Sequence, residues 1–144
     1  MSEDQNIRKK VVRDYIEQII NTGNPRHISD YISSDYIEEY NGQRYEMGIE
    51  GAINHIAGVR KTYPDLKLTI ERQICEAEWV ATYYVMEGTH EGEWMGIEPT
   101  NKKVKIYGVN LDKVISNKIV EHSGAANLLE PLLEIDAIEI KKKK

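Results

Sequence analysis

The sequence predicts an α+β fold, in which a curved antiparallel sheet packs against three helices and encloses an internal pocket. Helical patterns occupy the first half of the chain and strand patterns the second, which is typical of this class. The spacing of apolar residues changes from about 3.6 to about 2 residues just after Pro64. The chain also lacks a glycine-rich nucleotide-binding motif and any alternation of strands with helices. Its 144 residues suit a single domain, 1–144, that ends in a basic Lys tail at 141–144.

The helices are expected in the N-terminal half. Apolar residues at three- and four-residue steps predict a first helix that stops at Gly23. A second, short helix would be capped by Asn24 and broken by Ser33 and the residues that follow. The same helical spacing predicts a third helix from about Ile49 to Lys61.

The strands are expected mainly in the C-terminal half. Alternating apolar and polar residues predict one half-buried strand, and stretches rich in Val, Tyr and Thr predict others. The expected strands cover residues 66–71, 78–89, 103–115 and 118–123. Ser116 and Asn117 would form the tight turn of the last hairpin. Residues 36–40 form either a short strand or an extended segment, and a short final helix is expected from Asn127 to Leu133.

The composition excludes several classes of function. The net charge is -5, and it would be -9 without the four terminal Lys residues, so the acidic body repels nucleic acid. With one cysteine, Cys75, the chain cannot form an internal disulfide, and it has no zinc-binding Cys/His pattern. The N-terminus is charged, and no apolar run approaches the length of a membrane span. We therefore expect a cytoplasmic protein whose partners are neither nucleic acid nor membrane.

The aromatic residues are unusual in kind, with 9 Tyr, 2 Trp and no Phe. Buried Tyr and Trp need partners for their polar ends. This composition suits a pocket wall that is mostly apolar but carries some hydrogen-bonding groups, and the expected partner is a small organic molecule. The alternative is that most of these residues belong to the core and keep their hydroxyl groups in water.

Three segments resemble those of a known family. From Gly88 the chain reads GTHEGEWMGIEPTNKKV, the region after the third helix reads TYPDLKLTIE, and the last hairpin reads VISNKIVEHSGAANLLEPL. Together they resemble the SnoaL-like polyketide cyclase family, within the nuclear transport factor 2-like superfamily. That family typically shows F-P-D-L, then G-T-H-x-G with P-T-G-K, then G-K-I-x-E-H-W. The resemblance covers about Val11 to Leu133.

The resemblance implies a cone-shaped fold with a deep cavity, in a homodimer or a larger assembly. It also implies an enzyme with no cofactor and no metal, which closes a ring by intramolecular aldol condensation on a polyketide ester. In the family, an Asp after the last hairpin acts as acid and base. This chain has Asn127 at that position, Ser123 in place of a Trp, and Asn101 in place of a Gly.

The catalytic candidates are therefore His90, Asn127 and His122. An amide donates and accepts hydrogen bonds but cannot carry the proton, whereas a His serves as both base and acid near neutral pH. His90 follows a strand and either takes part in catalysis or organises its own loop. His122 and Glu121 point to opposite faces of the last strand, so one of them faces the cavity and the pattern leaves open which one.

The substrate-binding candidates are Tyr36, Tyr40, Trp94, Tyr107, Asp112 and Glu121. Tyr36 and Tyr40 fall where the chain crosses the cavity opening in similar folds. Trp94 lies between two glycines and acts either as a lid or in simple packing. Tyr107 and Asp112 lie on opposite faces of the third strand of the C-terminal half, whose mixed character suits a cavity wall or a dimer interface.

The favoured hypothesis is a cofactor-free polyketide or ester cyclase that uses acid–base aldol chemistry at a carbonyl. The alternatives are a non-catalytic protein that binds a small apolar ligand, and a dimeric scaffold of the same fold. An ionisable group with a displaced pKa that faces the cavity would favour the enzyme. A cavity lined by apolar side chains and amides would favour ligand binding, and a filled cavity would favour the scaffold.

Overall fold

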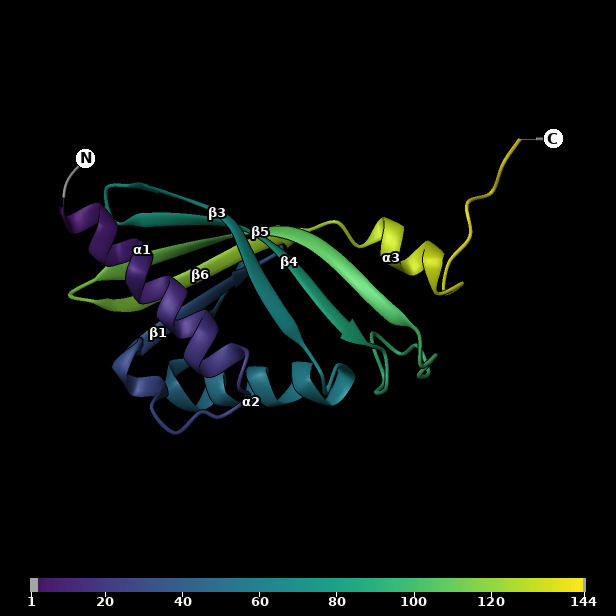
Figure 1. Cartoon of the computed structure of the whole chain (residues 1–144), viewed down its shortest axis with the longest axis horizontal. Coiled ribbons are helices and arrows are strands. Elements are labelled where there is room, and N and C mark those ends of the chain that lie inside the picture. Colours follow the sequence, from purple (N-terminus) through teal and green to yellow (C-terminus); the bar gives the residue numbers. More distant parts are fainter. Residues whose placement is uncertain (1–2, 144) are drawn as a thin grey trace.

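The computed structural model describes residues 3–143, and within them six strands form one curved sheet (Figure 1). The strands are β1 (Ile32–Tyr40), β2 (Gln43–Glu46), β3 (Lys67–Glu76), β4 (Trp79–Thr89), β5 (Lys103–Ile115) and β6 (Lys118–Ala126). Their order across the sheet is β2-β1-β6-β5-β4-β3. Neighbouring strands run antiparallel, with the exception that β1 and β6 run parallel. The predicted α+β class with a curved sheet is confirmed.

Helices cover one face of this sheet. Helix α1 (Glu3–Tyr15) continues into the π-helical turn η1 (Ile16–Ile20), and helix α2 (Gly48–Thr62) crosses beneath the strands. Helix α3 (Leu129–Glu134) follows β6 and lies beyond the end of the sheet (Figure 1). No helix within residues 3–143 is long and apolar enough to span a lipid bilayer.

Three details differ from the expectations. The short second helix is a single 3-10 turn, η2 (Ile28–Asp30), because Ile32 already begins β1. Strand β2 is not signalled by apolar alternation, since all four of its residues are exposed. The parallel pairing of β1 with β6 departs from a purely antiparallel sheet, because α2 and the four strands β2 to β5 separate the two in sequence and no hairpin links them.

The sheet buries its concave face unevenly, and this leaves a hollow. On β5, Val104, Ile106 and Val114 are buried on the concave face, whereas Lys105, Tyr107 and Val109 alternate with that face and are exposed. At the centre of the concave face, β5 and β6 carry Gly108 and Ala126 as direct partners. A Cβ added at Gly108 would lie 2.5 Å from the hydroxyl oxygen of Tyr84. Gly108 therefore makes room for Tyr84, and Tyr84 and Ala126 line the cavity that α2 closes from the other side.

Two of the recognised motifs contact each other at the end of α2. The carboxylate of Asp65 accepts hydrogen bonds from the backbone N–H and the hydroxyl of Thr89, each at 2.7 Å. The backbone N–H groups of Glu91 and Gly92 donate to the carbonyl oxygen of Thr62 at 3.0 and 3.1 Å. A Cβ at Gly92 would lie 2.1 Å from the carbonyl oxygen of Lys61. Glycine is therefore needed where the 88–92 segment passes against the helix end.

Replacing Gly92 with Ala tests this contact. Because the new methyl group would overlap backbone atoms, we expect the free energy of unfolding to fall by about 1–3 kcal/mol. Urea denaturation followed by circular dichroism measures the change. The matched control is Gly58→Ala, at an exposed site of α2 with no atom within 4 Å, which should raise stability by about 0.5–1 kcal/mol. Equal effects of the two substitutions would contradict the close approach at Gly92.

Candidate active site

A cavity of about 350 Å³ lies between α1, α2 and the concave face of the sheet. Its walls are mostly apolar, with side chains such as Ile56, Leu68 and Met86. Polar groups gather mainly at one end, where β1, β6 and β5 lie side by side. This combination suits an organic molecule that carries a few polar groups.

A His–Asp pair occupies this polar end. His122 on β6 is the direct partner of Asp112 on β5, so the two side chains share the concave face. Nδ1 of His122 lies 2.7 Å from Oδ1 of Asp112, and Asp112 is 4% exposed. The ionised carboxylate can only accept, so Nδ1–H of His122 donates this hydrogen bond. In the neutral ring the lone pair is therefore on Nε2. Because His122 lines the cavity, Nε2 is the nitrogen that remains for an occupant.

The surroundings of His122 favour its protonated form. On the other side of His122, Glu38 of β1 is its direct strand partner. Burial alone lowers the pKa of His122, but the carboxylates of Asp112 and Glu38 outweigh it and hold that pKa above its usual value. The imidazole can therefore both accept a proton and stabilise it, which is what acid–base catalysis needs.

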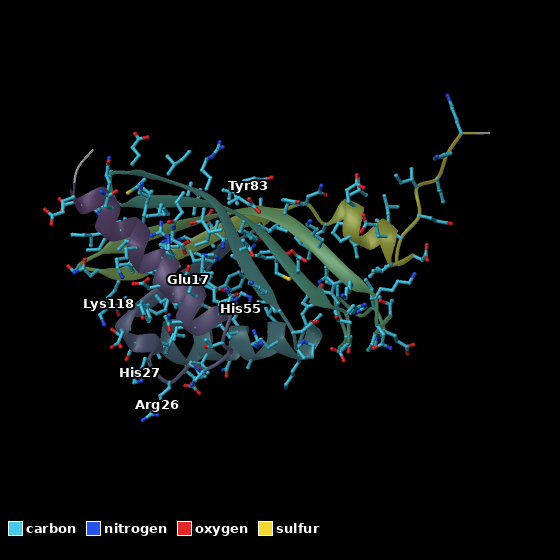
Figure 2. The ribbon with its side chains drawn as sticks, in the orientation of Figure 1. Glu17, Arg26, His27, His55, Tyr83 and Lys118 are labelled. Atoms are coloured by element: carbon cyan, nitrogen blue, oxygen red, sulfur yellow. The ribbon has the colours of Figure 1, made fainter. Side chains whose placement is uncertain are left out.

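Glu38 forms a second cluster at the same end. Its Oε1 accepts a hydrogen bond from the Tyr36 hydroxyl at 2.9 Å and lies 2.9 Å from Nδ1 of His55. Burial raises the pKa of Glu38, yet the contacts with His55 and Tyr36 prevail and hold that pKa below its usual value. Glu38 thus stays ionised beside His122. His55 reaches this cluster from α2, between that helix and the sheet (Figure 2).

The opposite end of the cavity is aromatic. The ring centroids of Tyr63 and Trp94 lie 5.7 Å apart, and those of His90 and Trp94 lie 5.9 Å apart. Tyr63 and Trp94 line the cavity, whereas His90 packs behind them with no exposed surface. Nδ1 of His90 lies 3.0 Å from the hydroxyl oxygen of Thr100.

The structure brings together four of the sequence-predicted residues. His122, Tyr36 and Trp94 line the cavity, and Asp112 lies directly behind His122. His90 lies beside the cavity but does not line it.

Four other candidates lie away from the cavity. Asn127 is exposed, and it follows Ala126 and precedes Leu128, which both line the cavity, so its side chain points elsewhere. Tyr40 is 72% exposed beyond the end of the cavity, and Tyr107 lies on the convex face, 42% exposed. Glu121 forms an ion pair with Arg44 of β2, because strand alternation turns it away from the face that carries His122.

Glu38, His55, Tyr15 and Tyr63 line the cavity but were not singled out from the sequence. Alternation from Tyr36 places Glu38 on the same strand face, so that residue could have been found. His55 lies three residues after the buried Ala52 on α2, a spacing that shares one helix face. No sequence pattern distinguishes Tyr15 and Tyr63 as cavity residues, because a buried tyrosine in the core has the same apolar neighbours in sequence. Within the described residues, no group of three His, Cys, Asp or Glu side chains could hold a metal ion.

Comparisons with known proteins show which proteins the chain is similar to. The profile of the SnoaL-like polyketide cyclase family matches residues 10–135. The chain is 32% identical over 107 residues to nogalonic acid methyl ester cyclase of Streptomyces nogalater, covering 71% of this chain and 78% of that protein. It is 30% identical over 127 residues to aklanonic acid methyl ester cyclase AcmA of Streptomyces galilaeus, covering 85% and 83%.

Solved structures share the fold. A SnoaL-like protein from Jannaschia sp. superimposes with a TM-score of 0.85 at 20% identity, covering 96% of this chain and 98% of that one. AclR from Streptomyces galilaeus superimposes with a TM-score of 0.82 at 23% identity, covering 94% and 99%. At these identities the likeness concerns the arrangement of helices and strands.

The coupling between His122 and Asp112 predicts a shift in titration. In the Asp112→Asn variant the pKa of His122 should fall, because burial still lowers it while one of the two carboxylates that raise it is gone. Nuclear magnetic resonance titration of the His122 ring measures the change. The control Asp30→Asn removes an exposed carboxylate and should leave the His122 titration unchanged. An unaltered His122 titration in Asp112→Asn would show that the pair is not electrostatically coupled.

Proposed function

Because the chain belongs to the SnoaL-like polyketide cyclase family, we propose that it closes a ring in a polyketide-derived ester. His122 serves as the acid and base, and Asp112 orients it. The observation that carries this proposal is the Asp112–His122 hydrogen bond of 2.7 Å at the polar end of the cavity. The relatives are methyl ester cyclases by name, so the proposed substrate is the methyl ester of a polyketide acid.

The cavity supports an enzyme over the two alternative functions. A pure ligand-binding module would need no titratable group in the cavity, yet His122 faces it with a raised pKa. A scaffold would fill the space, whereas about 350 Å³ is open. Both features favour acid–base chemistry on a bound organic molecule.

The proposed reaction is a proton transfer followed by carbon–carbon bond formation. Nε2 of His122 removes a proton from a carbon next to a carbonyl, and Glu38 and Asp112 stabilise the resulting imidazolium. The enolate carbon then attacks a second carbonyl carbon of the same molecule. The oxygen of that carbonyl becomes an alkoxide, which takes the proton back from Nε2. The product is an isomer of the substrate, so the step as proposed balances without a cofactor.

Tyr15 is our candidate for stabilising the negative oxygen. It is 9% exposed and lines the cavity. Burial, assisted by the charge of Asp112, raises the pKa of Tyr15, so its hydroxyl stays protonated and can donate a hydrogen bond.

Asn127 cannot supply the base in this proposal. In the family, the Asp after the last hairpin has that role, and an amide at the matching position does not titrate. Asn127 is also exposed and outside the cavity lining. We therefore assign the base to His122, which lies on β6 before Asn127 and faces the cavity.

The activity can be tested with the two methyl esters after which the similar cyclases are named. Purified protein should convert nogalonic or aklanonic acid methyl ester into a product of equal mass, followed by chromatography and mass spectrometry. His122→Gln should reduce kcat by roughly 10²- to 10⁴-fold, while the exposed His27→Gln change (Figure 2) leaves it unaffected. Undiminished turnover in His122→Gln would remove His122 from the mechanism, and no turnover by the wild type would count against this substrate class.

The pH dependence follows from the same assignment. Only the neutral imidazole is a base, so kcat/KM should increase as pH rises through the raised pKa of His122, above its usual value of 6.5.

We further propose that the protein is a homodimer that joins the convex faces of two sheets. Tyr83 and Tyr107 stack there with ring centroids 6.1 Å apart, and Tyr83 points away from the helices (Figure 2). Val109 and Leu111 beside them are 41% and 43% exposed. The face also carries negative and positive side chains, since Glu87 is the strand partner of Lys105 and Glu121 is the strand partner of Lys113. An apolar centre flanked by both signs suits a second copy of the same surface.

Changing Leu111 to Glu tests this interface. A buried, unpaired charge opposes association, so the variant should elute as a monomer where the wild type elutes as a dimer. Size-exclusion chromatography with light scattering gives both masses. Ile7→Glu, on the outer side of α1 where Ile7 is 39% exposed, should leave the mass unchanged. A monomeric wild type would contradict the dimer.

A further inference from the structure

We propose that the aromatic end of the cavity is an oxygen-recognition site, in which the Tyr63 hydroxyl donates a hydrogen bond to an oxygen atom on a flat ring of the bound ligand. This inference rests on the proposed function and deepens it, because it assigns which part of the substrate lies at which end. Tyr63 packs with Ile106 of β5. Ile106 and Asp112 are six positions apart on that strand, roughly 20 Å along it. The site is therefore separate from the base.

The hydroxyl group of Tyr63 lacks a partner of its own. The residue is 3% exposed and lines the cavity, and its hydroxyl oxygen has no hydrogen-bond partner within residues 3–143. Burial raises the pKa of Tyr63, so the group stays protonated and able to donate. A buried hydroxyl without a partner destabilises the protein. A ligand oxygen in the cavity would remove that destabilisation.

His90 places a second donor beside Tyr63. The backbone N–H of Thr100 donates to Nδ1 of His90 at 3.3 Å. Nδ1 is thus an acceptor, and the neutral ring carries its hydrogen on Nε2. Nε2 is also buried without a partner among the described residues. The ring centroids of His90 and Tyr63 lie 6.4 Å apart. Because Tyr63 lines the cavity and His90 does not, the Tyr63 hydroxyl is the donor that faces a ligand, and a carbonyl oxygen is the acceptor that an aromatic polyketide ring offers.

The side chains around Tyr63 indicate what kind of molecular framework would carry the oxygen atom. Trp94 presents its ring edge-on to Tyr63, with an angle of 68° between the ring planes. Leu66, Met86 and Ile106 complete an apolar surface at this end. Such walls exclude water and favour a flat hydrocarbon framework, while the hydroxyl of Tyr63 selects frameworks that carry an oxygen.

The test uses fluorenone and fluorene, two probes of one ring skeleton with and without a carbonyl oxygen. Quenching of Trp94 fluorescence gives the Kd of each, with the other tryptophan removed by Trp79→Phe in all proteins compared. Wild-type protein should bind fluorenone about three- to tenfold more tightly than fluorene, as one hydrogen bond provides. Tyr63→Phe should lose that preference, while the exposed Tyr40→Phe change (72% exposed) keeps it. Equal binding of the two probes by the wild type, or a preference that survives in Tyr63→Phe, would overturn the proposal.

Two further measurements separate this inference from the proposed chemistry. His122→Gln removes the proposed base but not the recognition site, so it should keep the preference for fluorenone even with all turnover lost. In wild-type protein the hydroxyl proton of Tyr63 should shift downfield with fluorenone and not with fluorene in nuclear magnetic resonance spectra. An active cyclase that binds both probes equally would refute the recognition site alone.

Discussion

The register of the β5–β6 hairpin is the constraint on which the candidate site depends. Ser116 and Asn117 turn the chain with φ values of +50° and +62°, the left-handed pair that fits a two-residue hairpin. This turn, together with a shift in register between Lys113 and Val114, sets Asp112 opposite His122. A slip of one residue would turn His122 to the convex face and bring Glu121 inward. The charge arrangement at the polar end is thus determined several residues away from it.

The two ends of the cavity differ in how their polar atoms are satisfied. At the polar end, Glu38 and Asp112 are each engaged by neighbours, so their charges are held in fixed positions. At the aromatic end, Tyr63 carries an unpaired polar atom among apolar walls. The first arrangement suits a group that must change its protonation, and the second suits a group that must recognise an atom of the ligand. The two ends of the cavity therefore offer a bound molecule different kinds of contact.

Local patterns predicted most of the fold but only part of the site. The alternation after Pro64 and the spacing in α2 follow from burial on one face, so both were visible in the sequence. Strand β2 was not, because its residues are exposed and its pairing with β1 comes from the Asn41–Gly42 turn.

For the site, the sequence indicated Asp112 and His122 as candidates. Their pairing depends on the register of β5 with β6, which cannot be deduced from either residue alone. Tyr40 and Tyr107 resembled cavity residues in type, yet their places on the strands put them outside. Of the departures from the family pattern, Asn101 has φ of +58°, a conformation that Asn tolerates better than most residues.

The pairing of Gly108 with Ala126 has a consequence for how such a protein diversifies. Ala126 lines the hollow with a single methyl group, Gly108 leaves the room that Tyr84 occupies, and neither residue takes part in the His122–Asp112 hydrogen bond. A larger side chain at position 126 would shorten the accepted guest, and one at position 108 would force Tyr84 to move. Substitutions at these positions would therefore change which compounds fit and leave the His122–Asp112 contact as it is.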